Sequence, residues 1–285
     1  MNYVNPDALV STEWLEKHLN APDVHIIDAT YYLPNDERDG AEEYSYRHIP
    51  GAVFFDIDDI CNSDIELPHM LPGPGKFSSR VRKLGLGDGC RIVVYDSSGG
   101  FMAACRVWWM FRVFGHTDIV VLNGGLFKWM KEKRPVNDEE VIPRPRHFSA
   151  SMNNMLVKTM SQMMKNVETQ EFQVIDARST SRFDGVDHEP NPTKKRGHIP
   201  GSINLPFTSL LNAKDNFTFK MADEIQAAFD EAGVDIGKPI AATCGSGVTA
   251  AVTAFALNLL GHDETAVYDG SWAQWGNHPD TPVDP

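Results

Sequence analysis

Short apolar runs alternate with longer segments of helical pattern along most of this chain. Residues 24–29 (Val-His-Ile-Ile-Asp-Ala) and 239–243 (Pro-Ile-Ala-Ala-Thr) are such runs, and 248–260 is a nearly continuous apolar helix that stops at Gly261. A glycine just after the last helical residue is typical of a helix C-terminus. Alternating strands and helices favour βα units on a parallel sheet that helices cover on both faces. The pattern predicts an α/β protein.

An internal repeat divides the chain into two similar halves. Three segments of the first half recur about half a chain later, which indicates two copies of one α/β module. The pairs are residues 24–29 with 172–177, His48-Ile49-Pro50-Gly51 with His198-Ile199-Pro200-Gly201, and 91–96 with 239–244.

Length and composition agree with two domains. At 285 residues the chain exceeds what one hydrophobic core usually supports. The polar, proline-containing stretch 137–150 breaks both periodicities, which is typical of a linker. We therefore expect a first domain over residues 1–140, a linker over 141–152 and a second domain over 153–285.

One cysteine lies at the turn between the predicted strand 239–243 and the apolar helix. The turn reads Cys244-Gly245-Ser246-Gly247-Val248-Thr249-Ala250, and so little side-chain bulk leaves its backbone N–H groups open to a ligand. The positive end of a helix dipole and unpaired N–H donors favour a thiolate in such a position. We predict that Cys244 is the nucleophile of an enzyme. The alternative is a buried, inert structural cysteine.

The same turn argues against phosphate chemistry. A phosphate-transferring cysteine loop needs an arginine six positions after the nucleophile, because a guanidinium fork matches the phosphate oxygens. That position is Ala250, and the intervening side chains carry no charge. A small organic substrate fits this turn better than a doubly charged inorganic anion.

The first module keeps the turn but lacks the thiol. Asp96 stands where the second module has Cys244, and Ser97-Ser98-Gly99-Gly100 follow it. We interpret this as one active and one supporting module, with Asp96 as a helix N-cap.

Charge and cysteine content exclude several classes of partner. A net charge of −13 and a pI near 5.1 argue against nucleic acid or an anionic membrane, which need clustered Lys and Arg. No apolar stretch reaches the ~18 residues of a membrane span. The four cysteines show no CxxC pair and no zinc-ligand spacing with histidine, so we expect reduced thiols, no metal and no cofactor. With no basic or Arg-rich leader at the N-terminus, we expect a cytoplasmic protein.

The other cysteines carry weaker expectations. Cys105 lies in an apolar helical segment and Cys90 at the edge of a strand, so we expect both to fill the core. Cys61 would be a redox-responsive thiol if it were exposed.

The two His-Ile-Pro-Gly motifs, the cysteine turn and the terminal Val267-Tyr268-Asp269-Gly270-Ser271-Trp272 resemble the tandem-domain rhodanese superfamily along nearly the whole chain. Within it, Cys-Gly-Ser-Gly-Val-Thr is similar to the loop of the 3-mercaptopyruvate sulfurtransferases, whereas thiosulfate sulfurtransferases carry basic residues there. The resemblance implies two tandem rhodanese-like domains, each a mostly parallel sheet flanked by helices, with the active site between them.

The resemblance also implies a reaction. Cys244 would take the sulfur of 3-mercaptopyruvate, release pyruvate and hold the sulfur as a persulfide. Thioredoxin, a small thiol or, in the test tube, cyanide would then remove it. The turn would bind the substrate and stabilise charge on sulfur through Gly245, Gly247, Val248 and Thr249.

For proton handling, the family pattern carries over onto Ser246, His69 and Asp58. A histidine oriented by a carboxylate would polarise the serine hydroxyl. From the residues alone, a structural role is as good an interpretation as the catalytic one: His69 would make hydrogen bonds within its loop, and Asp58 would cap a helix.

For the substrate carboxylate, Arg182 fits the first binding arginine of the family, since a guanidinium suits a bidentate contact. The second arginine of the family pattern is replaced by Asn191 in Glu189-Pro190-Asn191-Pro192. Lys194, Lys195 or Arg196 would be the source of the missing charge, and a lysine orients a keto acid less strictly than a guanidinium.

Two other functions stay open at this point. One is thiosulfate sulfurtransfer, and the other is a module that carries a persulfide to a protein partner with little turnover of small donors. The donor preference and the release of pyruvate distinguish them.

Overall fold

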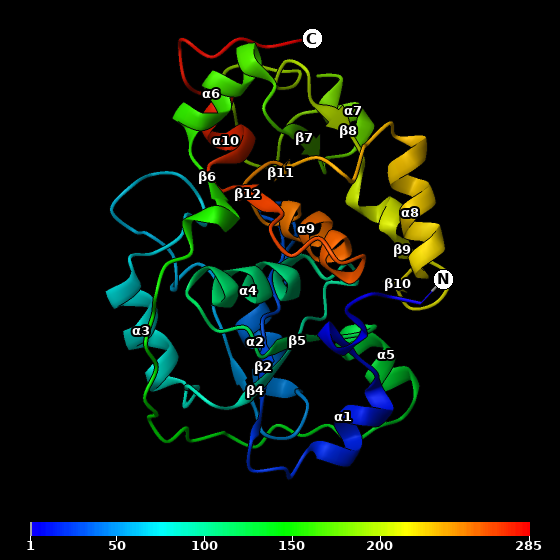
Figure 1. The fold of residues 1–285 in the computed structure, drawn as a ribbon. Helices are drawn as coiled ribbons and strands as arrows, with labels where there is room; N and C mark the ends of the chain where they lie inside the picture. Colours follow the sequence, from blue (N-terminus) through cyan, green and yellow to red (C-terminus); the bar gives the residue numbers. More distant parts are fainter. Residues whose placement is uncertain (1) are drawn as a thin grey trace.

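The computed structural model describes residues 2–285 and contains the same α/β layout twice (Figure 1). In the first module the strands are β1 (Leu9–Val10), β2 (Val24–Asp28), β3 (Ala52–Phe54), β4 (Arg91–Tyr95) and β5 (Ile119–Leu122). Its helices are α1 (Thr12–His18), α2 (Gly40–Tyr46), α3 (Pro74–Lys83), α4 (Met102–Val113) and α5 (Gly125–Lys131), after a short 3₁₀ turn η1 (Pro6–Ala8).

The second module begins after a stretch without helix or strand and a 3₁₀ turn, η2 (Asn154–Leu156). Its sheet contains β6 (Val157–Lys158), β7 (Gln173–Asp176), β8 (Ile203–Asn204), β11 (Ile240–Thr243) and β12 (Ala266–Tyr268). Its helices are α6 (Met160–Thr169), α7 (Thr180–Phe183), α8 (Ala222–Glu231), α9 (Ala250–Leu259) and α10 (Ser271–Trp275). A 3₁₀ turn η3 (Phe207–Leu210) and a small antiparallel pair, β9 (Leu211–Asn212) with β10 (Thr218–Phe219), are additions to the layout.

The two five-stranded sheets have the same strand order. It is β1-β5-β4-β2-β3 in the first and β6-β12-β11-β7-β8 in the second, and every pairing in both is parallel. The central strands are buried on both faces, as their apolar runs predict. The α/β fold with two mostly parallel sheets flanked by helices is confirmed.

The register shows that Asp96 and Cys244 occupy equivalent positions. Tyr95 pairs with Asp28 at the end of β4, and Thr243 pairs with Asp176 at the end of β11. The next residue in each case begins the turn that leads to α4 or to α9. The sequence alignment of these two turns is therefore correct in three dimensions.

The His-Ile-Pro-Gly motifs also have equivalent partners. His48 forms an isolated antiparallel bridge with Asn137, and His198 forms one with Asp284, so each module's C-terminal tail returns to its own motif. The boundaries 1–140, 141–152 and 153–285 stay a prediction; the contact of Asn137 with His48 agrees with placing residue 137 in the first module.

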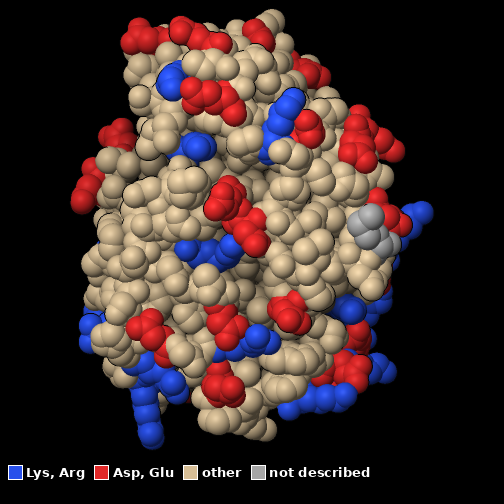
Figure 2. Space-filling view, in the orientation of Figure 1, with Lys and Arg blue, Asp and Glu red and all other residues tan. Residues whose placement is uncertain are grey.

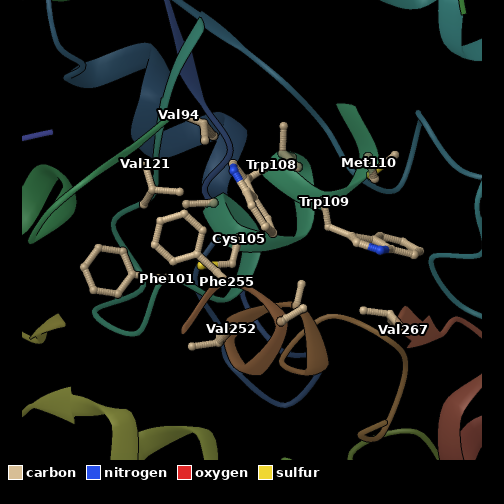
Figure 3. Packing of buried hydrophobic residues seen from close by; sticks show 14 of the residues in the cluster. Val94, Phe101, Cys105, Trp108, Trp109, Met110, Val121, Val252, Phe255 and Val267 are labelled. Atoms are coloured by element: carbon tan, nitrogen blue, oxygen red, sulfur yellow. The ribbon is translucent and has the colours of Figure 1, made fainter. Parts of the chain in front are cut away.

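Helices α4 and α9 pack against each other between the modules, and one hydrophobic core runs through both (Figures 1 and 3). Trp108 of α4 meets Phe255 of α9 edge to face, with ring centroids 4.8 Å apart. Every residue of α9 is buried, because one side faces its own sheet and the other faces α4. The helix begins two residues later than the apolar run predicts, and it ends as expected beside Gly261, whose φ is +97°.

One face of the molecule shows how its charges are distributed (Figure 2). On the face shown in Figure 2, acidic and basic side chains are interspersed and most of the visible surface is neither. None of the helices within residues 2–285 combines the length and the hydrophobicity that spanning a bilayer requires.

Candidate active site

Cys244 follows β11 directly and lines a cavity of about 120 Å³. Its N–H donates to Ser271 Oγ at 3.2 Å and its carbonyl accepts from the N–H of Trp272 at 2.9 Å, so α10 holds the backbone of this residue. Cys244 as a residue is only 2% exposed, yet it lines this cavity. Burial alone would fit a structural cysteine, and the cavity is what separates the two interpretations.

The turn after Cys244 presents unpaired donors. Within residues 2–285, the N–H groups of residues 245–249 have no hydrogen-bond acceptor, and they precede the N-terminus of α9. Gly247 has φ +77°, a conformation that L side chains rarely adopt. Such a turn is a ready site for negative charge. Of the predicted substrate-binding residues of the turn, Gly245, Val248 and Thr249 line the cavity, together with Ser246.

In the first module, a carboxylate fills the corresponding turn. Asp96 Oδ1 accepts from the N–H of Ser98 at 3.2 Å, and Oδ2 accepts from the N–H of Ala104 at 2.9 Å. The prediction that Asp96 is the N-cap of the following helix is wrong. Phe101, whose backbone is in the left-handed conformation, is the N-cap of α4. Asp96 nevertheless accepts a hydrogen bond from the first turn of that helix, although it lies eight residues before Ala104 in the sequence. Burial raises the pKa of this carboxyl group, against the lowering effect of these hydrogen bonds.

The other cysteines are poor nucleophiles. Cys90 and Cys105 are buried, as expected, and Cys61 is partly exposed and donates to the carbonyl of Asp58 at 2.8 Å. Burial raises the pKa of all three thiols, which disfavours the reactive thiolate.

The structure brings Asp58 and His69 together. Asp58 Oδ1 lies 2.8 Å from His69 Nδ1, and the histidine ring is almost fully buried. The other ring nitrogen, Nε2, is 3.1 Å from the hydroxyl of Tyr31 and makes no hydrogen bond to Ser246. His69 therefore has the expected carboxylate, but a tyrosine that the sequence analysis did not single out occupies the expected place of the serine.

A chain of charged groups leads into the cavity at Arg182. Arg182 Nε donates to Glu189 Oε2 at 3.1 Å, and Arg178 NH1 donates to Glu189 Oε1 at 2.7 Å. Arg178 also binds Asp176, with NH2 2.6 Å from Oδ2, and its guanidinium stacks over Trp272. Glu189 thus fixes the orientation of Arg182 and offsets part of its charge.

Asn191, which stands in place of the second family arginine, also lines the cavity. The neighbouring cations do not. Lys195 Nζ donates to three carbonyls of the C-terminal segment, and Arg196 contacts the ring of His188. The expectation that Lys195 or Arg196 supplies the missing charge is not supported, because both side chains have partners elsewhere. The side chain of Lys194 is exposed and does not line the cavity.

The first module closes the cavity from the other side. Leu33 and Met102 contribute to its wall, opposite Cys244 and Arg182 of the second module. The candidate site therefore lies between the two modules, as the resemblance implies.

The sequence model of the rhodanese-like domain family matches residues 11–132 and 159–278. The chain belongs to the rhodanese-like family. Human 3-mercaptopyruvate sulfurtransferase is 42% identical over 273 residues, which are 94% of this chain and 91% of that protein. Rat thiosulfate sulfurtransferase is also 42% identical, over 274 residues with the same coverage of each chain. The rhodanese-fold structure of SseA from Escherichia coli aligns with a TM-score of 0.85 and 38% identity, over 93% of this chain and 98% of that one.

Several residues of this rhodanese-like site escaped the sequence analysis. Tyr31 and Arg106 have partners that are distant in the sequence, and no local spacing marks them. Arg178 has nearer partners, Asp176 two residues before it and Glu189 eleven residues after it. Arg106 did carry one signal, because it is the lone charge within the apolar segment 101–111. A buried charge in an apolar helix is rare without a partner.

Proposed function

We propose that this rhodanese-like protein transfers the sulfur of 3-mercaptopyruvate to a thiol through a persulfide on Cys244. The Cys244 thiolate attacks the sulfur of the donor, the carbon–sulfur bond breaks, and its electron pair passes into the enolate of pyruvate. The sulfur stays on the enzyme as Cys–S–SH, and the enolate takes up one proton to give pyruvate. An acceptor thiolate then attacks the outer sulfur, forming the acceptor persulfide and restoring the Cys244 thiolate.

One observation carries this proposal. Cys244, Arg182 and four residues of the turn line one small cavity, and the N–H groups of those four residues have no acceptor within residues 2–285: Gly245, Ser246, Val248 and Thr249. The N–H groups would stabilise charge on the reacting sulfur, and Arg182 would bind the carboxylate of the donor. Relatives that match over nearly the whole chain are named sulfurtransferases, and we infer that this chain is a sulfurtransferase too.

The proton for the enolate is assigned to Ser246, His69 and Asp58. Ser246 lines the cavity, and its hydroxyl makes no hydrogen bond within residues 2–285, so it is available to a substrate. His69, oriented by Asp58 at 2.8 Å, would supply the proton. In this arrangement the hydroxyl of Tyr31, 3.1 Å from Nε2, would take the proton from His69 first, because Nε2 makes no hydrogen bond to Ser246.

The donor is assigned from the site, because the identities to mercaptopyruvate and thiosulfate sulfurtransferases are equal. Thiosulfate carries two negative charges. The turn offers no charged side chain, and the single cation of the cavity shares its charge with Glu189. A monoanionic keto acid suits this balance better than a dianion.

For the second half of the reaction we propose thioredoxin or a small thiol as acceptor. We keep the cytoplasm as the proposed compartment because the four cysteines are free thiols. One relative from Arabidopsis thaliana is mitochondrial.

The test uses one turnover with 3-mercaptopyruvate and no acceptor. The wild type should release about one pyruvate per enzyme and gain the mass of one sulfur atom, and Cys244→Ser should do neither. Cys61→Ser, which removes the most exposed thiol, should behave as the wild type does. A higher kcat/KM for thiosulfate would overturn the donor assignment, and a persulfide formed without pyruvate would favour the carrier function.

A further inference from the structure

Arg106 belongs to the first module but contacts both halves of the proposed site. It lies on α4, and its side chain is fully buried. NH1 donates to the carbonyl of Gly247 at 3.2 Å, and NH2 donates to the carbonyl of His69. One guanidinium therefore joins the histidine loop of the first module to the cysteine turn of the second.

Asp269 extends the same connection. Its Oδ1 lies 2.7 Å from Arg106 NH1, and its Oδ2 accepts from the N–H of Leu71 at 2.7 Å. Asp269 follows β12 of the second module, whereas Leu71 lies two residues after His69 in the first. The ion pair thus binds the histidine loop at two points.

The cysteine turn is pressed against this ion pair. A Cβ atom added at Gly247 would lie 2.7 Å from the carbonyl oxygen of Asp269 and 3.0 Å from Arg106 NH1. The face of Trp109 packs 4.5 Å from the guanidinium carbon and holds the plane of the group. Asp269, the carbonyls of Gly247 and His69, and the Trp109 ring therefore all restrict the orientation of this guanidinium.

Stability alone is a weak reason for such an arrangement. A buried ion pair loses the hydration of two charges, and an apolar pair of similar volume is often as stable or more so. What a planar guanidinium offers is direction, since it holds two acceptors at fixed positions. The acceptors here are the carbonyls of His69 and of the residue after Ser246.

We propose that Arg106, held by Asp269, is a positioning residue that keeps His69 in register with the Cys244 turn for proton transfer to the departing enolate. This role rests on the proposed function. Arg106 does not line the cavity beside Cys244; it would act through the histidine loop and the cysteine turn, whose backbone carbonyls it binds.

The principal variant is Arg106→Lys, which retains the buried charge near Asp269 but cannot hold both carbonyls. We expect the rate of pyruvate release in one turnover to fall by about tenfold to a hundredfold, because small misplacements of reacting groups have effects of this size. The KM for the donor should stay within about threefold, since Arg182 is untouched.

Arg112→Lys is the matched control. Arg112 lies on the same helix, stacks over Trp108 and donates to the carbonyl of Asp263 in the second module, away from the cavity. Its pyruvate release should stay within about twofold of wild type. Equal losses in the two variants would mean that both arginines only join the modules, and would overturn the proposal.

A double-mutant cycle tests whether Arg106 acts through His69. If it does, Arg106→Lys should slow a His69→Gln enzyme by less than about twofold, because the group it positions is gone. Additive losses would overturn the positioning role. Asp269→Asn provides a second variant should Arg106→Lys fail to fold, and it should show the same non-additivity with His69→Gln.

The two failures are distinguishable. A wild type that releases no pyruvate in one turnover overturns the proposed function itself. The positioning role alone is overturned if the wild type does release pyruvate and Arg106→Lys either leaves the rate unchanged or slows it additively with His69→Gln. Circular dichroism and thermal unfolding of each variant show whether the fold is retained.

Discussion

Arg178 and Arg182 bind opposite oxygens of one carboxylate, that of Glu189. Arg178 is anchored in turn by Asp176, so the cation that faces the cavity is fixed by a buried row of charges. The row is neutral as a whole, with two arginines and two carboxylates. A donor anion therefore meets oriented hydrogen-bond donors with little net attraction.

Replacing Glu189 should change the donor preference. In Glu189→Gln the negative charge beside Arg182 is lost, and a dianion gains more from that change than a monoanion. We expect the ratio of kcat/KM for thiosulfate to kcat/KM for 3-mercaptopyruvate to rise by about threefold to tenfold. Glu171→Gln, which removes an exposed carboxylate paired with Lys165, should leave the ratio unchanged. An unchanged ratio in Glu189→Gln would show that charge does not set donor choice.

Adding the missing arginine should tighten donor binding. Asn191 lines the cavity, so Asn191→Arg places a second guanidinium beside Arg182. We expect a KM for 3-mercaptopyruvate lower by about threefold to tenfold, with kcat nearly unchanged. Asn191→Lys adds the same charge without the planar fork and should lower KM less. No change in KM for either variant would contradict a carboxylate site at this wall.

The glycines of the cysteine turn should respond differently to alanine. A Cβ at Gly245 would lie 2.6 Å from Arg182 NH2 and would displace that side chain from its place beside Glu189, so we expect mainly a raised KM. A Cβ at Gly247 would meet the backbone oxygen of Asp269 at 2.7 Å where φ is +77°. We expect Gly247→Ala to lose about 1–3 kcal/mol of stability together with most of its kcat. Steady-state kinetics and denaturant unfolding of both variants check this, and equal effects would contradict it.

Asp28 should make the stability of the fold depend on pH. Asp176, its equivalent in the second module, pairs with Arg178, but within residues 2–285 Asp28 accepts hydrogen bonds from Thr30 and Tyr95 and has no cationic partner. Burial raises the pKa of the Asp28 carboxyl to about 6. Because this is above the ordinary value, the stabilising contribution is present at low pH and is lost as the pH rises through about 6.

The measurement compares the wild type with Asp28→Asn between pH 5 and pH 7.5. The wild type should lose about 1 kcal/mol of unfolding free energy relative to the variant over this range. Asp64→Asn, which removes an exposed carboxylate, is the control. Parallel stability curves for wild type and Asp28→Asn would mean that the group is ionised throughout.

The sequence predicts those features that depend on local pattern. The repeat led to two parallel sheets of one strand order, and the glycines around Ser246 led to the open turn after Cys244. The pairing of Asp58 with His69 came from the family pattern and is present in the structure.

The features that the sequence does not predict depend on which loops meet. Tyr31 reaches His69 from a different loop, and Arg106 reaches Gly247 across the two modules. Lys195 lies next to the cavity loop in sequence but bonds to the C-terminal tail. In each case the folded chain, and not spacing along it, decides the partner.

The shared core of α4 and α9 has a consequence for the chain as a duplicated protein. Trp108 and Phe255 fill one interior, so separating the halves would expose both to water and leave Gly247 without its arginine donor. The copy that lacks the thiol is therefore no vestige. It acts as a covalently attached subunit, and substitutions in its interior would change the geometry around Cys244 in the other copy.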